Sequence, residues 1–135
     1  MVYCLDTDTV SVAYSAAPPL ALVRRLARTP ATEQCTTAIT IGELAYGAAR
    51  RGGRRLTELV EEVVRQTHVI QAFDLRAGRR YGELRAELER DGRRLEEPDL
   101  RIASICLARD LTLVTGNVRH FDRVPGLRVE NWLER

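Results

Sequence analysis

Lysine is absent from this sequence: all 21 basic residues are arginines, set against 19 acidic residues, and the formal net charge is +2. So small a net charge does not by itself indicate a nucleic-acid or membrane partner. The arginines do cluster, at positions 50–51, 54–55, 79–80 and 93–94. Because the planar guanidinium suits contact with phosphates, these pairs are either solvated helix faces or contacts for a phosphate backbone.

Long apolar runs are also missing, since none approaches the roughly 20 residues that span a bilayer. The first residues carry no basic segment, and Asp6 and Asp8 interrupt their apolar stretch, which does not fit a secretory signal. Hydrophobic residues make up 44% and charged residues 30%, as in soluble globular proteins. We expect a single domain over residues 1–135, without membrane contact, in the cytoplasm.

Cysteine and histidine are too few and too scattered for the common metal and redox motifs. The three cysteines stand at positions 4, 35 and 106 and the two histidines at 68 and 120, without the close spacing of a zinc site. We expect the cysteines to be buried, reduced thiols. No glycine-rich phosphate loop is present either.

Four acidic residues, by contrast, stand nearly alone among apolar neighbours. Asp6 and Asp8 are the only charges in the first 13 residues, Glu43 is the only one in residues 35–48, and Asp99 heads an apolar helical stripe. An ionised carboxylate in apolar surroundings is costly unless a cation neutralises it. Two carboxylates about 4 Å apart repel by about 4 kcal/mol at an effective dielectric of about 20. If the fold brings these acids together, Mg²⁺ or Mn²⁺ is the expected partner.

Short apolar runs alternate with amphipathic segments, which predicts an α/β fold with a mainly parallel sheet of about five strands and helices on both faces. Strands are expected at residues 3–6, 35–38, 68–73, 111–115 and 127–130. Helices are expected to begin at residues 7–9, to follow Pro19 as far as residue 28, and to cover residues 40–52, 54–66, 75–90 and 98–109. Asp8 or Thr9 is the expected cap of the first helix, leaving Asp6 free to point into a site.

The isolated acids are expected at one edge of the sheet, because ligands of such sheets bind outside the carboxyl ends of the strands. Asp6 ends the first strand and Thr115 ends the fourth. Glu43 lies one turn into the helix after the second strand, and Asp99 lies in the first turn of the helix that leads to the fourth. Structural explanations also remain open: a turn or cap for Asp6, an exposed helix position for Glu43, and a first-turn acid for Asp99.

Four segments resemble, in order, the motifs of PIN-domain ribonucleases. They are residues 5–9 (LDTDT), 40–47 (TIGELAYG), 98–103 (PDLRIA) and 113–121 (LVTGNVRHF). Residues 124–132 (VPGLRVENW) are similar to the corresponding segment of the VapC-type toxins of bacterial type II toxin–antitoxin pairs. Each motif alone is weakly specific, but the resemblance covers essentially the whole chain.

This resemblance implies a three-layer α/β/α PIN-like fold with an acidic pocket that binds Mg²⁺ or Mn²⁺. It implies an endoribonuclease that cleaves RNA with an activated water, forms a homodimer, and is inhibited by a small cognate antitoxin, with which it forms larger assemblies. Asp6, Glu43 and Asp99 match the family's metal-binding acids. Thr115 and Asn117 match its Thr-x-(Asn/Asp) motif.

The chain departs from the family pattern at the fourth acid. Many relatives carry that acid at the position of Asn117 or of His120, and this chain has neutral side chains at both. Three acids rather than four favour one well-bound ion over two. His120 is expected either to orient water or a phosphate or to pack beside Phe121.

The expected roles follow from the chemistry of phosphodiester hydrolysis, which needs a nucleophile, charge neutralisation and positioning. The expected catalytic set is Asp6, Glu43, Asp99 and Asn117, with Asp6, Asp99 and Glu43 as metal ligands; the supporting residues are Asp8, Thr115 and His120; and the RNA-phosphate contacts are Arg119 and Arg123.

Two competing functions also fit parts of the sequence. Residues 5–9 match the D-x-D-x-T signature of haloacid-dehalogenase-type phosphatases, but those enzymes usually also use a lysine and a late acidic pair, which this chain lacks. With no fourth acid, the protein could instead be a weakly active binding module that acts with its antitoxin as a co-repressor on DNA. The sequence does not identify the RNA, its cleavage site or the type of antitoxin.

Overall fold

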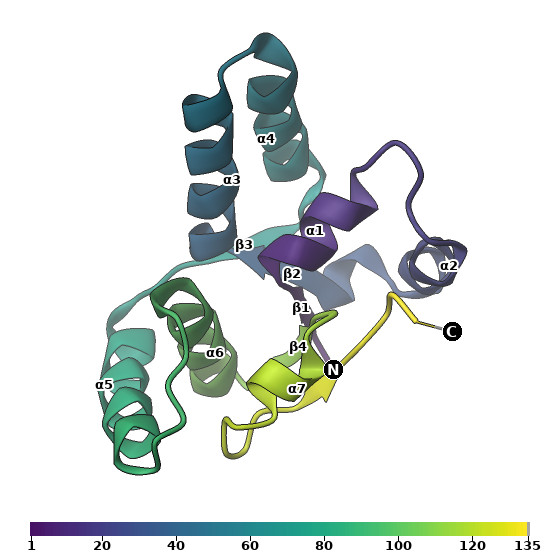
Figure 1. Cartoon of the computed structure of the whole chain (residues 1–135). Helices are drawn as coiled ribbons and strands as arrows, with labels where there is room; N and C mark the ends of the chain where they lie inside the picture. The colour runs from purple at the N-terminus through teal and green to yellow at the C-terminus, as the bar shows by residue number, and fades with distance from the viewer. Residues whose placement is uncertain (135) are drawn as a thin grey trace.

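The protein is built on a small, fully parallel β-sheet, seen in a computed structural model that describes residues 1–134 (Figure 1). The strands are β1 Tyr3–Leu5, β2 Gln34–Thr37, β3 Val69–Gln71, β4 Thr112–Val114 and β5 Val129–Glu130. The helices are α1 Thr7–Ala13, α2 Leu20–Arg28, α3 Ala38–Arg51, α4 Arg54–Gln66, α5 Leu75–Arg90, α6 Glu97–Arg109 and α7 Val118–Phe121, with a short 3-10 helix at Ala31–Glu33.

The strand order β3-β2-β1-β4-β5 places β1 at the centre of the sheet. The chain moves outward from β1 to β3 on one side and then returns to β4 and β5 on the other. The backbone N–H of Asp6 donates to the carbonyl of Val114 at 3.0 Å, so the ends of β1 and β4 stay paired. The point where the strand order reverses therefore lies between the carboxyl ends of β1 and β4, where such sheets bind their ligands.

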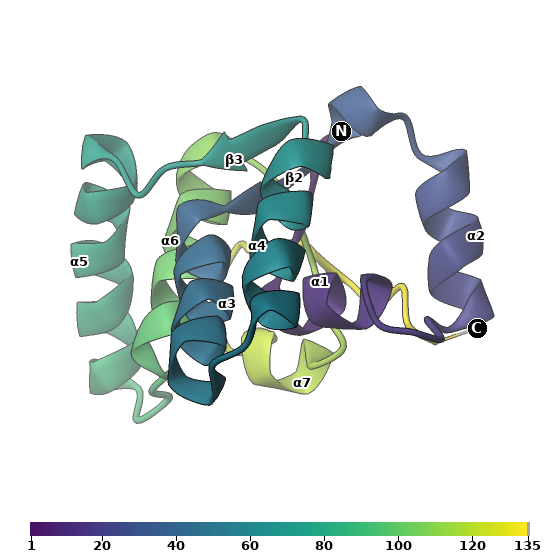
Figure 2. The same ribbon diagram turned by 90° about the horizontal axis from the view of Figure 1, so that it is seen from above.

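Alternating side chains divide the core into two layers, one on each face of the sheet. On β1, Cys4 packs with the buried residues of α5 and α6, whereas Leu5 packs with those of α1, α2 and α4. On β4, Leu113 and Val114 alternate in the same way. This period of two is the signature of a strand that is buried on both faces. Viewed from above, α5 and α6 lie on one side of the molecule and α1 and α2 on the other (Figure 2).

The fold class is the predicted three-layer α/β/α arrangement, and α4 and α5 have the predicted bounds. Four of the strands are shorter than predicted, β4 for example covering three residues instead of the five at 111–115, whereas β2 has the predicted length but begins one residue earlier. The helix after β2 begins at Ala38 instead of Thr40, because the Thr37 hydroxyl accepts the Thr40 N–H and caps it. Helix α7 and the 3-10 helix were not predicted. Both are single turns, too short for a hydrophobic period to reveal.

Two compositional predictions can also be compared with the structure. The three cysteines are free and buried, as predicted. Among the helices of residues 1–134, none combines the length and the apolar character that crossing a bilayer requires.

Candidate active site

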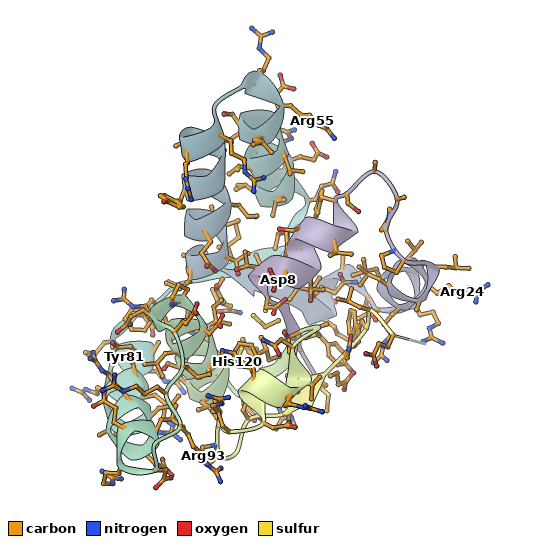
Figure 3. All side chains as sticks on the ribbon, viewed as in Figure 1. Asp8, Arg24, Arg55, Tyr81, Arg93 and His120 are labelled. Atoms are coloured by element: carbon orange, nitrogen blue, oxygen red, sulfur yellow. The ribbon has the colours of Figure 1, made fainter. Side chains whose placement is uncertain are left out.

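The predicted acids meet at the carboxyl edge of the sheet, where α1, α3, α6 and α7 approach the ends of β1 and β4. The negative charges of Glu43 and Asp6 both act on Asp99, although the three residues come from different elements. In Figure 3, Asp8 on α1 and His120 on α7 mark the two sides of this region. The three predicted acids therefore lie near enough for their charges to interact.

Asp6 caps α1 as well as facing the site. Its Oδ1 accepts the backbone N–H of Thr9 at 2.8 Å, and the Thr115 hydroxyl, directly after β4, lies near enough to lower the pKa of this carboxyl. The residue is only 5% exposed. Burial raises the pKa of Asp6, and the neighbouring Thr115 and Thr9 partly offset the rise. The expectation that Asp8 or Thr9 would be the cap was therefore wrong: the residue that ends β1 also begins α1.

Asp8 does not take the supporting role that the sequence suggested. It is exposed in the first turn of α1, and none of the hydrogen bonds or ion pairs within residues 1–134 involves its side chain. Its negative charge still raises the pKa of Asp6 slightly further, after the larger effect of burial. Asp8 thus adds negative potential at the rim instead of holding another residue.

Glu43 is held by α1. Its Oε1 accepts a hydrogen bond from the Thr7 hydroxyl at 2.5 Å, and Thr7 Oγ1 lies 3.1 Å from Thr40 Oγ1. Sequence reasoning missed Thr7 and Thr40 as site residues. The available signal was their spacing: Thr7 directly follows Asp6, and Thr40 lies three residues before Glu43, on the same side of a helix.

Asp99 pairs with His120. Its Oδ2 lies 3.1 Å from His120 Nε2, which joins α6 to α7. Burial raises the pKa of Asp99; the neighbouring His120 opposes this rise, and the charges of Glu43 and Asp6 add to it. The His120 ring also packs edge-on against Phe121, with ring centroids 5.4 Å apart. The packing expectation is thus met, and the contact with Asp99 is an addition that the sequence did not reveal.

The loop after β4 carries the Thr115–Asn117 motif. The Asn117 N–H donates to Thr115 Oγ1 at 3.0 Å, so the Thr115 side chain stabilises the loop. Asn117 is exposed and begins α7 without a capping hydrogen bond from its side chain. A Cβ on Gly116 would stand 2.7 Å from Leu133 Cδ1, so glycine permits the C-terminal segment to approach this loop closely.

The two arginines expected at the rim differ in their surroundings. Arg119 is exposed on α7. Arg123 follows α7, and its Nη1 donates to the backbone carbonyl of Arg94 at 2.8 Å. That bond ties the loop between α5 and α6, from which Arg93 extends outward (Figure 3), to the segment that carries His120. Arg123 therefore has a structural contact in addition to the proposed contact with phosphate.

The donor set fits a hard divalent cation in its chemistry, because it consists of carboxylate oxygens whose mutual repulsion and burial a cation would offset. In the present side-chain positions, no three histidine, cysteine, aspartate or glutamate side chains within residues 1–134 form a ready ligand cluster. The hydrogen bonds described above explain this spacing: each acid is held by its own partner from a neighbouring element.

Comparison with known proteins identifies the family. Residues 3–127 match the PIN domain. The chain is 33% identical over 131 residues to the tRNA(fMet)-specific endonuclease VapC of Salmonella typhimurium, covering 96% of this chain and 97% of that one. It is 31% identical over 132 residues to ribonuclease VapC2 of Haemophilus influenzae, covering 97% and 98% of the two chains.

Solved structures agree with this assignment. The chain superposes on VapBC2 from Rickettsia felis, bound to a DNA fragment from their promoter, with a TM-score of 0.86 and 31% identity over 98% of this chain and 99% of that one. It superposes on DNA-bound VapBC from Salmonella typhimurium with a TM-score of 0.84 and 30% identity, covering 98% of each chain. The chain therefore belongs to the PIN-domain family and, within it, to the VapC proteins.

Proposed function

We propose that this protein is a Mg²⁺- or Mn²⁺-dependent endoribonuclease and acts as the toxin of a toxin–antitoxin pair. The observation that carries this proposal is the meeting of Asp6, Glu43 and Asp99 at the carboxyl edge of the sheet, in a chain that matches VapC ribonucleases along its whole length. The phosphatase alternative is not retained, since the family match accounts for the opening motif together with Glu43 and Asp99, which that alternative leaves unexplained.

In the proposed reaction, Asp6 and Asp99 bind the ion and Glu43 completes the ligand set or accepts a proton from the attacking water. A bound divalent cation supplies neutralisation of the phosphate charge and acidification of water. The Thr9 N–H orients Asp6, and His120 orients Asp99. Because these partners fix each carboxylate before substrate arrives, less ordering remains to be done when RNA binds.

The remaining site residues act on the substrate. Asn117 lies exposed at the start of α7, where its amide can reach a phosphate or a sugar hydroxyl. Arg119 and Arg123 contact the RNA backbone on the same side of the pocket. With three acids and no fourth, the pocket holds one well-bound ion. A second ion would bind weakly, together with the RNA phosphate.

The partner is a small antitoxin whose binding blocks the pocket. Support comes from the similarity to VapBC complexes from Rickettsia felis and Salmonella typhimurium, both of which were solved with DNA. We infer that this chain forms a homodimer and, with its antitoxin, a larger assembly. The tRNA(fMet)-specific relative makes initiator tRNA the first RNA to test.

The test is cleavage of RNA by the purified protein without its antitoxin. We expect cleavage of one RNA class with Mg²⁺ or Mn²⁺, none with excess EDTA, and none by Asp99→Asn with either ion. Cleavage that persists in EDTA would contradict the metal dependence. A wild-type protein that binds its antitoxin and promoter DNA but leaves every RNA class intact would favour the alternative function as a co-repressor module.

A further inference from the structure

Each acid of the site has a hydrogen-bonding partner from another element, and the partner of Glu43 has no assigned role. Asp6 accepts the backbone N–H of Thr9 in α1, and Asp99 is paired with His120. Glu43, on α3, accepts from Thr7 on α1 at 2.5 Å. Hydrogen bonds to a charged acceptor are shorter and stronger than those between neutral groups, so this contact restrains the carboxylate.

Two buried threonines behind Thr7 determine the direction in which its proton points. Thr7 Oγ1 lies 3.1 Å from Thr40 Oγ1, which lies 3.4 Å from Thr37 Oγ1. An ionised carboxylate can only accept, and each hydroxyl has one proton to donate. Thr7 therefore donates to Glu43 and accepts from Thr40, and Thr40 accepts from Thr37. Thr37 Oγ1 already accepts the Thr40 N–H at 3.1 Å, which leaves its proton for this chain.

The environment of the three threonines supports a fixed arrangement. Thr37 and Thr40 are completely buried, and Thr7 is half-buried beside the site. Aligned hydrogen bonds polarise one another, so the bond that reaches Glu43 is strengthened by the two behind it. Only Oε1 of Glu43 accepts a hydrogen bond from residues 1–134, so Oε2 is left to meet a cation or a water molecule.

The first turn of α1 thus holds two of the acids at once. Asp6 is its cap and Thr7 is its first residue, so the same backbone turn that fixes Asp6 also carries the hydroxyl that fixes Glu43. We propose that Thr7 is a positioning residue of the nuclease, which aims Glu43 at the ion and the attacking water and is itself oriented by Thr40 and Thr37. This inference rests on the function proposed above.

The test compares Thr7→Val, which removes the hydroxyl at nearly constant shape, with Thr7→Ser, which keeps it. Thr67→Val is the matched control, because Thr67 is also half-buried and its hydroxyl donates to the Val63 carbonyl at 2.6 Å, just before β3 at the other end of the sheet. Four quantities are measured: Mn²⁺ affinity by calorimetry, kcat and KM for RNA cleavage, and the melting temperature of the metal-free protein.

We expect Thr7→Val to lower Mn²⁺ affinity and kcat by about 10- to 100-fold, the usual effect of losing a residue that orients a metal ligand. KM for RNA should change little, because the proposed role of Thr7 is to hold Glu43 and not to contact substrate. Thr7→Ser should restore both quantities, and Thr67→Val should alter neither. Thr40→Val, which removes the donor behind Thr7, should shift both in the same direction as Thr7→Val but less, and provides a second reading if Thr7→Val folds poorly.

Several results would overturn the inference. One is a Thr7→Val protein that loses only melting temperature, as the Thr67→Val control does, while its Mn²⁺ affinity and kcat stay at wild-type values. Tighter Mn²⁺ binding by Thr7→Val, or failure of Thr7→Ser to restore activity, would also overturn it. Wild-type protein that binds Mn²⁺ but cleaves no RNA would refute the proposed function alone, since the affinities still test the positioning. Wild-type protein that binds no Mn²⁺ would refute both.

Discussion

His120 Nε2 lies 3.1 Å from Asp99 Oδ2, so a residue of the short helix α7 directly contacts an acid of α6. Helix α7 spans four residues and has no side-chain cap, so it depends on contacts with its neighbours. The buried ring of Phe121 supplies one such contact and the His120–Asp99 pair supplies another. At position 120, where the family pattern allows a fourth acid, this chain therefore has a histidine that contacts Asp99, the third acid.

The substitution His120→Asp tests this relationship. It would place a carboxylate beside Asp99, and two such charges about 4 Å apart repel by about 1 to 4 kcal/mol, depending on the effective dielectric. We expect the metal-free variant to melt at a lower temperature than wild type. Its melting temperature should rise more than that of wild type when Mn²⁺ is added. His120→Asn, which adds no charge, is the control. Equal gains from Mn²⁺ in both variants would show that charge at position 120 does not govern ion binding.

The capping role of Asp6 changes what its substitution should do. If repulsion among the acids of the site were the only effect, Asp6→Ala would leave the metal-free protein as stable as wild type or more stable. Loss of the bond from the Thr9 N–H opposes this, because losing a helix cap costs about 0.5 to 2 kcal/mol. We expect Asp6→Asn to fold stably, since its amide oxygen can still cap α1, and to lose cleavage. Urea unfolding should show Asp6→Ala to be the less stable of the two variants.

The raised pKa values of Asp6 and Asp99 predict how stability depends on pH. The folded protein holds these two protons more tightly than the unfolded chain. The metal-free protein should therefore gain stability from them as pH falls from their raised pKa values towards the ordinary aspartate range, and lose that contribution as pH rises. Because other carboxylates act in the opposite direction, the quantity to measure is the difference between wild type and Asp99→Asn in melting temperature.

The melting temperature of Asp99→Asn should exceed that of wild type by the largest amount at neutral pH, and this excess should shrink in acid. Mn²⁺ affinity should fall over the same range, because protons compete with the ion for Asp6 and Asp99. A difference that stays constant between acid and neutral pH would show that Asp99 titrates as an ordinary exposed aspartate.

The parts of the fold that the sequence predicted are those that repeat a signal over several residues. Helices α4 and α5 carry clear amphipathic periods; Gly52–Gly53 marks the start of α4 and Asp91–Gly92 marks the end of α5. The sheet edge that gathers the acids followed from the alternation of strands and helices. Helix α7 could not be predicted, because four residues hold barely one period and its contacts come from the distant Asp99.

The acids of the site could be identified from the sequence because they stand alone among apolar residues. The residues that hydrogen-bond to them could not be identified in this way. The roles of Thr7, Thr40 and Thr37 depend on how α1 meets α3, which no local pattern encodes. The role of Asp6 as the cap of α1 was missed for a different reason. Ser, Thr, Asp and Asn are all good caps, so propensity alone does not choose among residues 6–9. The register with β4, fixed by the Asp6 N–H to Val114, makes Asp6 the cap.

The arginine contacts predict a distinct salt dependence for two variants. Single-stranded RNA binding weakens with salt with a log–log slope of about −0.7 per phosphate contacted. We expect Arg119→Ala to weaken binding and flatten the slope by roughly one contact without affecting stability. Arg123→Ala should flatten the slope similarly but also lower the melting temperature, because it loses the bond to the Arg94 carbonyl. If the slope stays unchanged in both, neither arginine contacts RNA.

The final prediction concerns the close approach of Leu133 to Gly116. A Cβ at Gly116 would stand 2.7 Å from Leu133 Cδ1. Because that methyl group is the end of a half-buried, flexible side chain that can move aside, the cost should lie near the lower end of the about 1 to 3 kcal/mol typical of overpacking. Gly116→Ala should therefore destabilise the protein and, because Gly116 lies between Thr115 and Asn117, lower cleavage. Leu133→Ala should remove the clash, so Gly116→Ala made in that background should cost little. Urea unfolding of the four proteins measures the coupling, and an equal cost of Gly116→Ala in both backgrounds would show that Leu133 is not the reason for glycine here.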